Sequence, residues 1–356
     1  MKNRRNIIAT IAMAVLLTFG LAVGSGSADQ LQPGRNDSTP AQTAAPAPTA
    51  AAPVVTAAQT TPEQFYRKVW KIAKDDFLWQ DRLTDWDQWE HKYDGKLATQ
   101  ADAEKAINEM LDSLKDGYTY FRNNGATQSK ATQTAATNVV TYRMIGSVGY
   151  LKIATFGSEN AASETEAALK ALNKAGAKSF IVDLRDNGGG YVAQAFAITG
   201  MFLDQGEFAQ VKGYKNGKQY TEVMTVTKTT LEDKENGTVT SNPTRVGNLT
   251  GKKPVFILVN GGSASASEML AGSLQDNGRA KVVGMKTFGK GIAQLNIDLP
   301  FNTSMQVTFA KLYQPAGDCI HGVGMTPDYV VGVVPKTDAQ LARALELAEP
   351  KPKAKP

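Results

Sequence analysis

The chain has 356 residues, 42% of them hydrophobic, which is enough to bury one substantial core and a second, smaller domain. Its formal charge of +5 comes from the two ends, since three basic residues lie within positions 1–5 and three lysines within 351–355. The near-neutral remainder excludes a nucleic-acid footprint on the folded part. The single cysteine, Cys319, excludes an internal disulfide and a multi-thiolate metal site.

Residues 1–28 have the order of an export signal: a basic start, an apolar stretch from Ile7 to Val23, and small residues after it. Two interpretations stay open, cleavage near Gly24 or Ala28 and an uncleaved membrane anchor. We therefore expect an exported protein, periplasmic or extracytoplasmic, which the N-terminus would tether to the membrane if the segment is not removed.

Residues 29–60 are rich in alanine, proline and threonine and predict a disordered linker. Order begins at Thr61, where "TPEQ" offers an N-cap, a proline at the first helical position and a glutamine for a capping box. Apolar faces at helical spacing follow, and the last one ends near Gly117, which fits a residue just beyond a helix C-terminus. The pattern predicts a small helical domain over residues 61–121.

Strand-like and helix-like segments alternate over residues 139–336. Buried-type strands are expected at "SFIVDLR" and "VFILVN", with a helix over 161–175 that Gly176 closes and another over 267–275. Two further strands are expected near "AQLNIDL" and "SMQVTFAKLY". This alternation predicts an α/β fold. Residues 337–356 are expected to form a C-terminal helix and a basic tail.

Both buried strands end in glycine-bearing loops followed by helices, "DNGGGYVAQAF" and "GGSASASEML". In α/β sheets such loops collect ligands and catalytic groups, but the glycine spacing matches no phosphate-binding motif. A hydrolase reading needs a nucleophile and a base. The two histidines, His91 and His321, lie in the helical segment and in a late loop, whereas Lys290 in "KTFGKGIAQ" has glycines on both sides and a second lysine, Lys286, nearby. Burial and that charge would lower its pKa, which makes Lys290 a candidate base.

Three stretches together resemble the carboxyl-terminal processing (tail-specific) proteases of family S41: "FIVDLRDNGGG", "ILVNGGSASASEMLAGSLQDNGRAKVVGMKTFGKGIAQ" and "GDCIHGVGMTPDYVV". The likeness covers most of residues 140–335, and "DGYT" is similar to the turn that ends that family's N-terminal helices. The resemblance implies a mixed-sheet protease core of the ClpP/crotonase-like type, a serine-type endopeptidase with a Ser/Lys dyad, polypeptide substrates, and neither a metal nor an organic cofactor.

The resemblance also assigns roles to individual residues. Ser265 matches the nucleophile, Lys290 the general base and Gln294 the group that orients the lysine. The backbone N–H groups of Gly189 and Ala266 match the oxyanion donors. Gly188 stands where the family commonly has proline, so the choice among Gly188–Gly190 stays open. Taken alone, Ser265 and Glu268 would be only a capping box at a helix start.

Members of this family usually carry a PDZ domain between the N-terminal helices and the core, where it captures the substrate's C-terminal tail. Only about twenty residues separate Phe121 from "VVTYRM", so we expect the PDZ domain to be absent and cleavage to be PDZ-independent, with an adaptor protein as a possible replacement. The alternative function is a catalytically silent protein that binds peptides or small ligands in the same cleft.

Overall fold

The computed structural model describes residues 60–124 and 138–349. The expected export segment at 1–28, the linker up to residue 59 and the basic tail from residue 350 lie outside the described residues and stay predictions. Within the described ranges, no helix is long and apolar enough to cross a membrane.

The N-terminal helices follow the predicted pattern closely. Thr61 caps α2 with its side chain, and Gln64 returns a bond to the Thr61 N–H, so the capping box is confirmed. Two tryptophans then lock the helices together, because Trp70 and Trp86 each donate their indole N–H to the other's backbone carbonyl. The elements of this part are α2 (Pro62–Asp76), a 3-10 helix (Gln80–Leu83), α3 (Trp86–His91) and α4 (Gln100–Asp112).

One helix end differs from the prediction. Helix α4 ends at Asp112, and Gly117 lies beyond it with an ordinary negative φ. The left-handed residue after this helix is Lys115, at φ 52°. The glycine signal was wrong here because the chain turns two residues earlier, where the Leu114 N–H bonds to the Leu111 carbonyl and the Lys115 N–H to the Asp112 carbonyl.

A six-stranded sheet forms the centre of the region that follows residue 138. Its order is β13-β10-β9-β4-β3-β2, and all neighbours are parallel except the β2/β3 hairpin at one edge. Strands β4 and β9 lie in the middle with every residue buried, as expected for apolar runs covered on both faces. The strands are β2 (Val140–Ile145), β3 (Val148–Ile153), β4 (Ser179–Asp183), β9 (Val255–Val259), β10 (Lys281–Gly284) and β13 (Tyr329–Val330).

Helices cover both faces of this sheet. Alternate residues of the central strands divide between two apolar clusters: Phe180 and Ile257 belong to the main core, whereas Ile181 and Leu258 pack with Ala344 of α8 on the other face. These observations confirm the predicted α/β class. The helices are α5 (Ala161–Lys174, with Gly176 in the left-handed region as predicted), α6 (Val192–Thr199), α7 (Ala266–Asp276) and α8 (Ala339–Ala348).

A second sheet of seven strands was only partly predicted. Its order is β1-β12-β5-β6-β7-β8, with β11 also paired to β12, and all its pairs are antiparallel. The sequence indicated β11 and β12 but not the strands between residues 206 and 241. The bounds are β1 (Tyr120–Asn123), β5 (Gly206–Lys215), β6 (Lys218–Val226), β7 (Leu231–Glu235), β8 (Thr238–Ser241), β11 (Ile292–Leu299) and β12 (Thr303–Tyr313).

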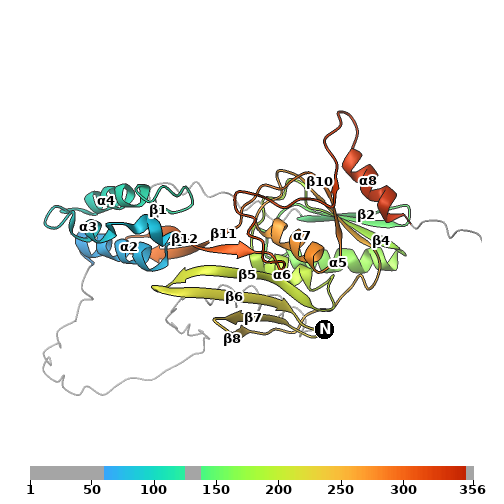
Figure 1. Ribbon diagram of the computed structural model, residues 1–356, viewed down its shortest axis with the longest axis horizontal. Coiled ribbons are helices and arrows are strands. Elements are labelled where there is room, and N and C mark those ends of the chain that lie inside the picture. Colours follow the sequence, from blue (N-terminus) through green and yellow to red (C-terminus); the bar gives the residue numbers. More distant parts are fainter. Residues whose placement is uncertain (1–59, 125–137, 350–356) are drawn as a thin grey trace, which may run out of the picture.

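The long strand β12 joins the helical end of the molecule to the rest. Figure 1 shows α2, α3 and α4 at one end of the long axis, the six-stranded sheet with its helices at the other, and β12 and β11 running between them. Strand β1, which follows α4, pairs with β12, and Phe65 of α2 and Val307 of β12 belong to one continuous apolar cluster. The helical part therefore rests directly on β12, the antiparallel partner of β11, and β11 begins just after Lys290. The expected domain boundary at residue 121 stays a prediction.

Candidate active site

Parallel pairing of β4 and β9 brings the two glycine-bearing loops to the same sheet edge. Asp183 lies opposite Leu258, so both strands end at the same level and their loops leave in the same direction. Asn260 and Asp186 then link the loops through two hydrogen bonds: Asn260 Oδ1 accepts from the Asp186 N–H, and Asn260 Nδ2 donates to Asp186 Oδ1. The two glycine-bearing loops therefore lie side by side at one edge of the sheet.

The three alternating serines have different environments. The Ser263 hydroxyl donates to the Leu184 carbonyl and the Ser267 hydroxyl to the Asn187 carbonyl, both at 2.8 Å, and both serines are fully buried. Ser265 is half-buried and lies at the turn where β9 gives way to α7, with φ 56° and ψ −119°. A non-glycine residue held in this sparsely populated region marks a strained turn of the kind found at functional sites. Of the three serines, Ser265 is the one presented toward solvent.

Glu268 connects the serine turn to the lysine loop. Its fully buried carboxylate accepts from the backbone N–H groups of Ser265 at 2.8 Å, Gly289 at 2.8 Å and Lys290 at 2.9 Å. The Thr287 hydroxyl is a fourth donor. The sequence predicted the bond to Ser265 but missed the other three, because nothing local relates α7 to a loop about twenty residues later. Glu268 thus fixes the backbones of the candidate nucleophile and the candidate base relative to one another.

The side chains of the predicted dyad are not joined. Among the residues that the structure describes, no hydrogen bond connects the Lys290 ammonium to Ser265 or to Gln294. Lys290 Nζ instead lies 5.2 Å from the ring centroid of Tyr118, in the turn after α4. Gln294 lies on β11, opposite Thr308, and its buried side-chain nitrogen has no partner within the described ranges. The structure thus brings the backbones of the predicted residues together and leaves their side chains apart.

Of the two expected oxyanion donors, the Ala266 N–H is free within the described ranges and the Gly189 N–H is already bonded. Gly189 packs beside the serine: a Cβ added to it would lie 2.7 Å from the Ala264 carbonyl and 2.9 Å from Ser265 Cβ, and its φ of 97° is one that glycine tolerates. Its N–H, however, donates to Asn187 Oδ1 at 3.0 Å. The Ala266 N–H, by contrast, has no hydrogen-bond acceptor in the described part of the chain, which leaves it free for a ligand.

His321 borders the lysine loop from the other side. A Cβ added to Gly291 would lie 2.6 Å from the His321 backbone nitrogen, so the two loops pack without space for a side chain there. The His321 ring contacts Trp79 at 6.2 Å between centroids, and burial, with Lys311 as a second cause, holds its pKa below the usual value. The other histidine, His91, lies exposed on the helical end and pairs with Asp94. Neither imidazole is hydrogen-bonded to Ser265 within the described ranges.

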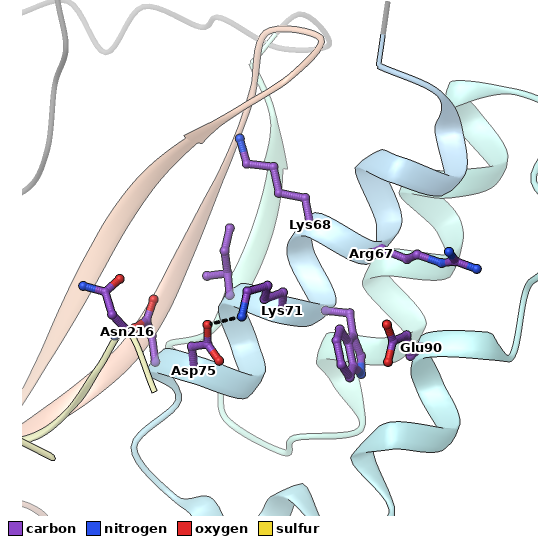
Figure 2. A pocket seen from close by; sticks show the side chains of 9 residues that line it. Arg67, Lys68, Lys71, Asp75, Glu90 and Asn216 are labelled. Carbon is purple, nitrogen blue, oxygen red and sulfur yellow. Dashed lines mark hydrogen bonds and ion pairs between the residues drawn. The ribbon is translucent and has the colours of Figure 1, made fainter. Parts of the chain in front are cut away.

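A hollow of about 480 Å³ lies elsewhere, on the outer side of α2. Figure 2 shows its charged lining, in which Lys71 and Asp75 form an ion pair and Asn216 enters from the β5–β6 turn. None of Ser265, Lys290 and Gln294 lines it, and its positive and negative side chains balance. We therefore do not assign this hollow to the candidate active site.

Comparison with known proteins decides the family. The sequence model of Peptidase family S41 matches residues 147–331, more than half of the chain. This chain belongs to peptidase family S41. The matched span contains the serine turn, the lysine loop and both glycine-bearing loops.

Two curated relatives are carboxyl-terminal-processing proteases. The one from Bartonella bacilliformis is 38% identical over 196 residues, 54% of this chain and 40% of that protein. The one from Picosynechococcus sp. is 38% identical over 208 residues, 56% of this chain and 45% of that protein. The chain therefore spans less than half the length of these relatives.

Solved structures show the same fold at low sequence identity. The photosystem II D1 C-terminal processing protease superposes with a TM-score of 0.63 at 20% identity, covering 80% of this chain and 97% of that one. A lipoprotein from Streptococcus agalactiae gives a TM-score of 0.61 at 14% identity, covering 83% of this chain and 98% of that one. The mixed α/β fold expected for this family is thereby confirmed.

Proposed function

We propose that the protein is an exported serine endopeptidase that cuts extended or unfolded polypeptides through an acyl-enzyme on Ser265. One observation carries the proposal: Glu268 binds the backbone of Ser265, which sits in a strained turn at the start of α7, and also the backbone of Lys290. A buried carboxylate that holds both backbones supports a joint role for the two residues, since hydrolysis by this route needs a nucleophile and a base at fixed positions.

In the proposed mechanism, neutral Lys290 takes the proton from the Ser265 hydroxyl as its oxygen attacks the peptide carbonyl. The carbonyl oxygen becomes an oxyanion that accepts from the Ala266 N–H. Collapse of this intermediate breaks the C–N bond, and Lys290 returns the proton to the leaving amine. Water, deprotonated by the same lysine, then hydrolyses the ester and restores Ser265. Gln294 orients the lysine during these transfers.

Two local rearrangements precede the first step. The Lys290 side chain leaves the Tyr118 ring and approaches Ser265, and a second oxyanion donor comes from the glycine loop. The Gly189 N–H can serve if it gives up its bond to Asn187, and the neighbouring N–H groups of Gly188 and Gly190 have no hydrogen-bond acceptors among the described residues. Gly188, which has no neighbour within 4 Å of an added Cβ, gives this loop room to turn.

We further propose that cleavage does not depend on a PDZ domain. Strand β1 ends at Asn123 and β2 begins at Val140, and the intervening sequence is far too short for such a domain. Polypeptides are then held by the core and the helical end, or through an adaptor protein. Export, with tethering to the membrane if residues 1–28 are retained, remains part of the proposal and rests on the sequence of that segment alone.

The test is cleavage of an unfolded polypeptide by the protein without residues 1–59, beside Ser265→Ala and Lys290→Ala. Each variant should lose at least about a hundredfold in kcat/KM, because members of one catalytic unit fail together. Circular dichroism and melting temperature check that both variants fold. A C-terminally amidated copy of one peptide, cut within about threefold of the free acid, would support PDZ independence.

The same experiment separates the alternative, a catalytically silent binding protein. Such a protein would bind the polypeptide without cutting it, and Ser265→Ala would leave both the binding and the absence of products unchanged. Cleavage that persists in Ser265→Ala would instead assign the activity to another residue or to a contaminant, and either result would refute the proposed mechanism.

A further inference from the structure

The aromatic ring of Tyr118 lies next to the ammonium group of Lys290, the candidate base. Lys290 Nζ is 5.2 Å from the centroid of the Tyr118 ring, within the range of a cation–π interaction. Across residues 60–124 and 138–349 no hydrogen bond or ion pair of this ammonium is found. The ring is therefore the principal attraction on the charged end of Lys290 in this conformation.

Tyr118 is held in place by its own turn and by the neighbouring strand. Asp116 accepts from the Tyr118 N–H at 3.1 Å and from the Thr119 hydroxyl at 2.7 Å. Strand β12 adds two bonds: Gln306 Nε2 donates to the Tyr118 carbonyl, and the Thr308 N–H donates to the Thr119 hydroxyl. These bonds fix the backbone of the turn, so the point from which the Tyr118 side chain extends stays in place when Lys290 moves.

Lys290 is fixed at its backbone and free at its end. Glu268 binds the Lys290 N–H, while two buried polar groups on β11 and β12 have no partners among the described residues. The side-chain nitrogen of Gln294 and the hydroxyl of Thr308 are both buried without partners in the described part of the protein. The Lys290 backbone is held in position while these two buried groups have no partners within the described ranges. This combination indicates that the Lys290 side chain has a second conformation.

We infer that Tyr118 is a positioning residue that holds the ammonium form of Lys290 away from Ser265. The inference deepens the proposed function and rests on its Ser/Lys mechanism. The negative face of the ring attracts an ammonium and gives no such attraction to a neutral amine. Loss of the proton therefore releases Lys290 toward the serine, and Tyr118 raises the pH at which the base becomes available. The helical end of the chain would act on catalysis through this one ring.

The other titratable groups packed around the lysine loop come from four elements, and none of them is altered by a change at Tyr118. They are Glu268 on α7, Asp116 in the turn before β1, Lys311 opposite Ile292 on β12, and His321 against Gly291. Their effects on Lys290 are common to all variants below, so a difference between variants reports the ring.

The test is the pH dependence of kcat/KM on an unfolded peptide for wild type, Tyr118→Leu and Tyr118→Phe. Leucine removes the ring face, so the midpoint of the rising limb should move to lower pH by about half a unit, and activity well below the midpoint should rise roughly threefold. Phenylalanine keeps the face, so its midpoint should stay within about 0.2 unit of wild type.

Tyr120→Leu is the matched control. Tyr120 also has a cation over its ring, Arg122 at 4.6 Å, and lies on the same short segment, whereas Lys290 lies over the Tyr118 ring. It should leave the midpoint in place. An unchanged or higher midpoint in Tyr118→Leu, or an equal shift in Tyr118→Phe or Tyr120→Leu, would overturn the inference. Failure of the proposed function is distinct, because it would appear as full activity in Lys290→Ala.

Discussion

Glu268 at the start of α7 and Gln294 on β11 differ in how completely they are bonded. The Glu268 carboxylate is fully buried and accepts from four donors on two segments of chain. The side-chain nitrogen of Gln294 is buried as well and has no partner in the described part of the protein. The α7 side of the site is thus complete before substrate arrives, whereas the β11 side still has a bond to make.

This difference in bonding indicates that the two side chains contribute differently to stability and to catalysis. Burying a carboxylate is costly unless its oxygens are satisfied, so a group as completely bonded as Glu268 must contribute to stability as well as position. An unsatisfied buried amide lowers stability and persists where another benefit offsets it. We therefore expect changes at Glu268 to affect both folding and catalysis, and changes at Gln294 to affect catalysis alone.

The largest effect is expected from Glu268→Gln. The amide keeps one acceptor oxygen but directs an NH₂ group at N–H donors, which leaves at least two of them unsatisfied. We expect kcat/KM to fall at least about a hundredfold and the free energy of unfolding to drop by about 3 kcal/mol. Denaturant unfolding and peptide cleavage measure the two losses. A variant with wild-type stability and activity would contradict the proposed role of this carboxylate.

Gln294→Leu should lower catalysis without lowering stability. Leucine has a similar volume and removes the unpartnered nitrogen, so the free energy of unfolding should stay the same or increase slightly. The value of kcat should fall about tenfold with little change in KM, because the lysine loses the group that orients it only when it reaches the serine. A loss of stability without a loss of kcat would mean that Gln294 has a structural role.

Local patterns in the sequence were sufficient to predict part of this arrangement. The capping box at Thr61, the central strands and the bond from Ser265 to Glu268 all depend on residues a few positions apart. The bonds from Glu268 to the lysine loop and the contact between Tyr118 and Lys290 join distant segments, and no spacing rule encodes them. The resemblance to the S41 proteases indicated which residues to examine but not how their side chains would lie.

The seven-stranded sheet contains another buried polar side chain outside the candidate active site, and there the effect of burial on stability can be measured apart from catalysis. Asp233 on β7 is 6% exposed, and its carboxyl group is hydrogen-bonded to the carboxyl group of Glu222. Burial, with Glu222 as the next cause, raises the pKa of Asp233 to about 8. The pKa of Glu222 is raised as well, and Tyr220, Glu235 and Lys215 face the same cluster.

This cluster predicts a pH-dependent stability. The folded protein keeps the Asp233 proton up to about pH 8, whereas the unfolded chain loses it near the ordinary value of ~4. The folded state binds more protons between these limits, so stability should fall as pH rises from about 4 to 8 and change little above that. Asp233→Asn should reduce this fall. At pH 8 it should stabilise the protein by at least roughly 1 kcal/mol, which corresponds to a rise of about 2–4 °C in the melting temperature.

The measurement is the melting temperature of wild type and Asp233→Asn at several pH values, with cleavage activity followed beside it. A gain at pH 8 with unchanged kcat/KM would show that this buried carboxyl group lowers stability without serving catalysis, in contrast to the role proposed for Gln294. An equal effect at pH 4 and pH 8 would contradict the raised pKa.

The strands that carry this cluster illustrate why the second sheet was not predicted. Strands β6 and β7 place Glu222, Glu235 and Asp233 on a covered face, where a sequence pattern of polar residues suggests exposure. Strands β5, β6 and β7 are consecutive hairpins, and these carboxylates are covered because the pairing places Glu222 opposite Glu235 and Asp233 on one face with Tyr220 and Lys215. A hydrophobic alternation rule therefore fails in this segment for a physical reason.

The smallest effects are expected at Ser263 and Ser267, the two serines that flank the proposed nucleophile. Each hydroxyl donates to a carbonyl that keeps a second donor, so Ser267→Ala should cost about 1 kcal/mol of stability and change kcat/KM by less than about threefold.

Ser263 also accepts from the Asn260 N–H at 3.0 Å, and alanine leaves that donor unpaired. Ser263→Ala should therefore be the less stable of the two, by roughly another 1 kcal/mol, while still cutting peptide. Thermal unfolding ranks the variants, and peptide cleavage checks that both remain enzymes. If either alanine variant folds normally and loses more than a hundredfold in kcat/KM, that serine and not Ser265 is the nucleophile, and the strained turn at Ser265 serves only to start α7.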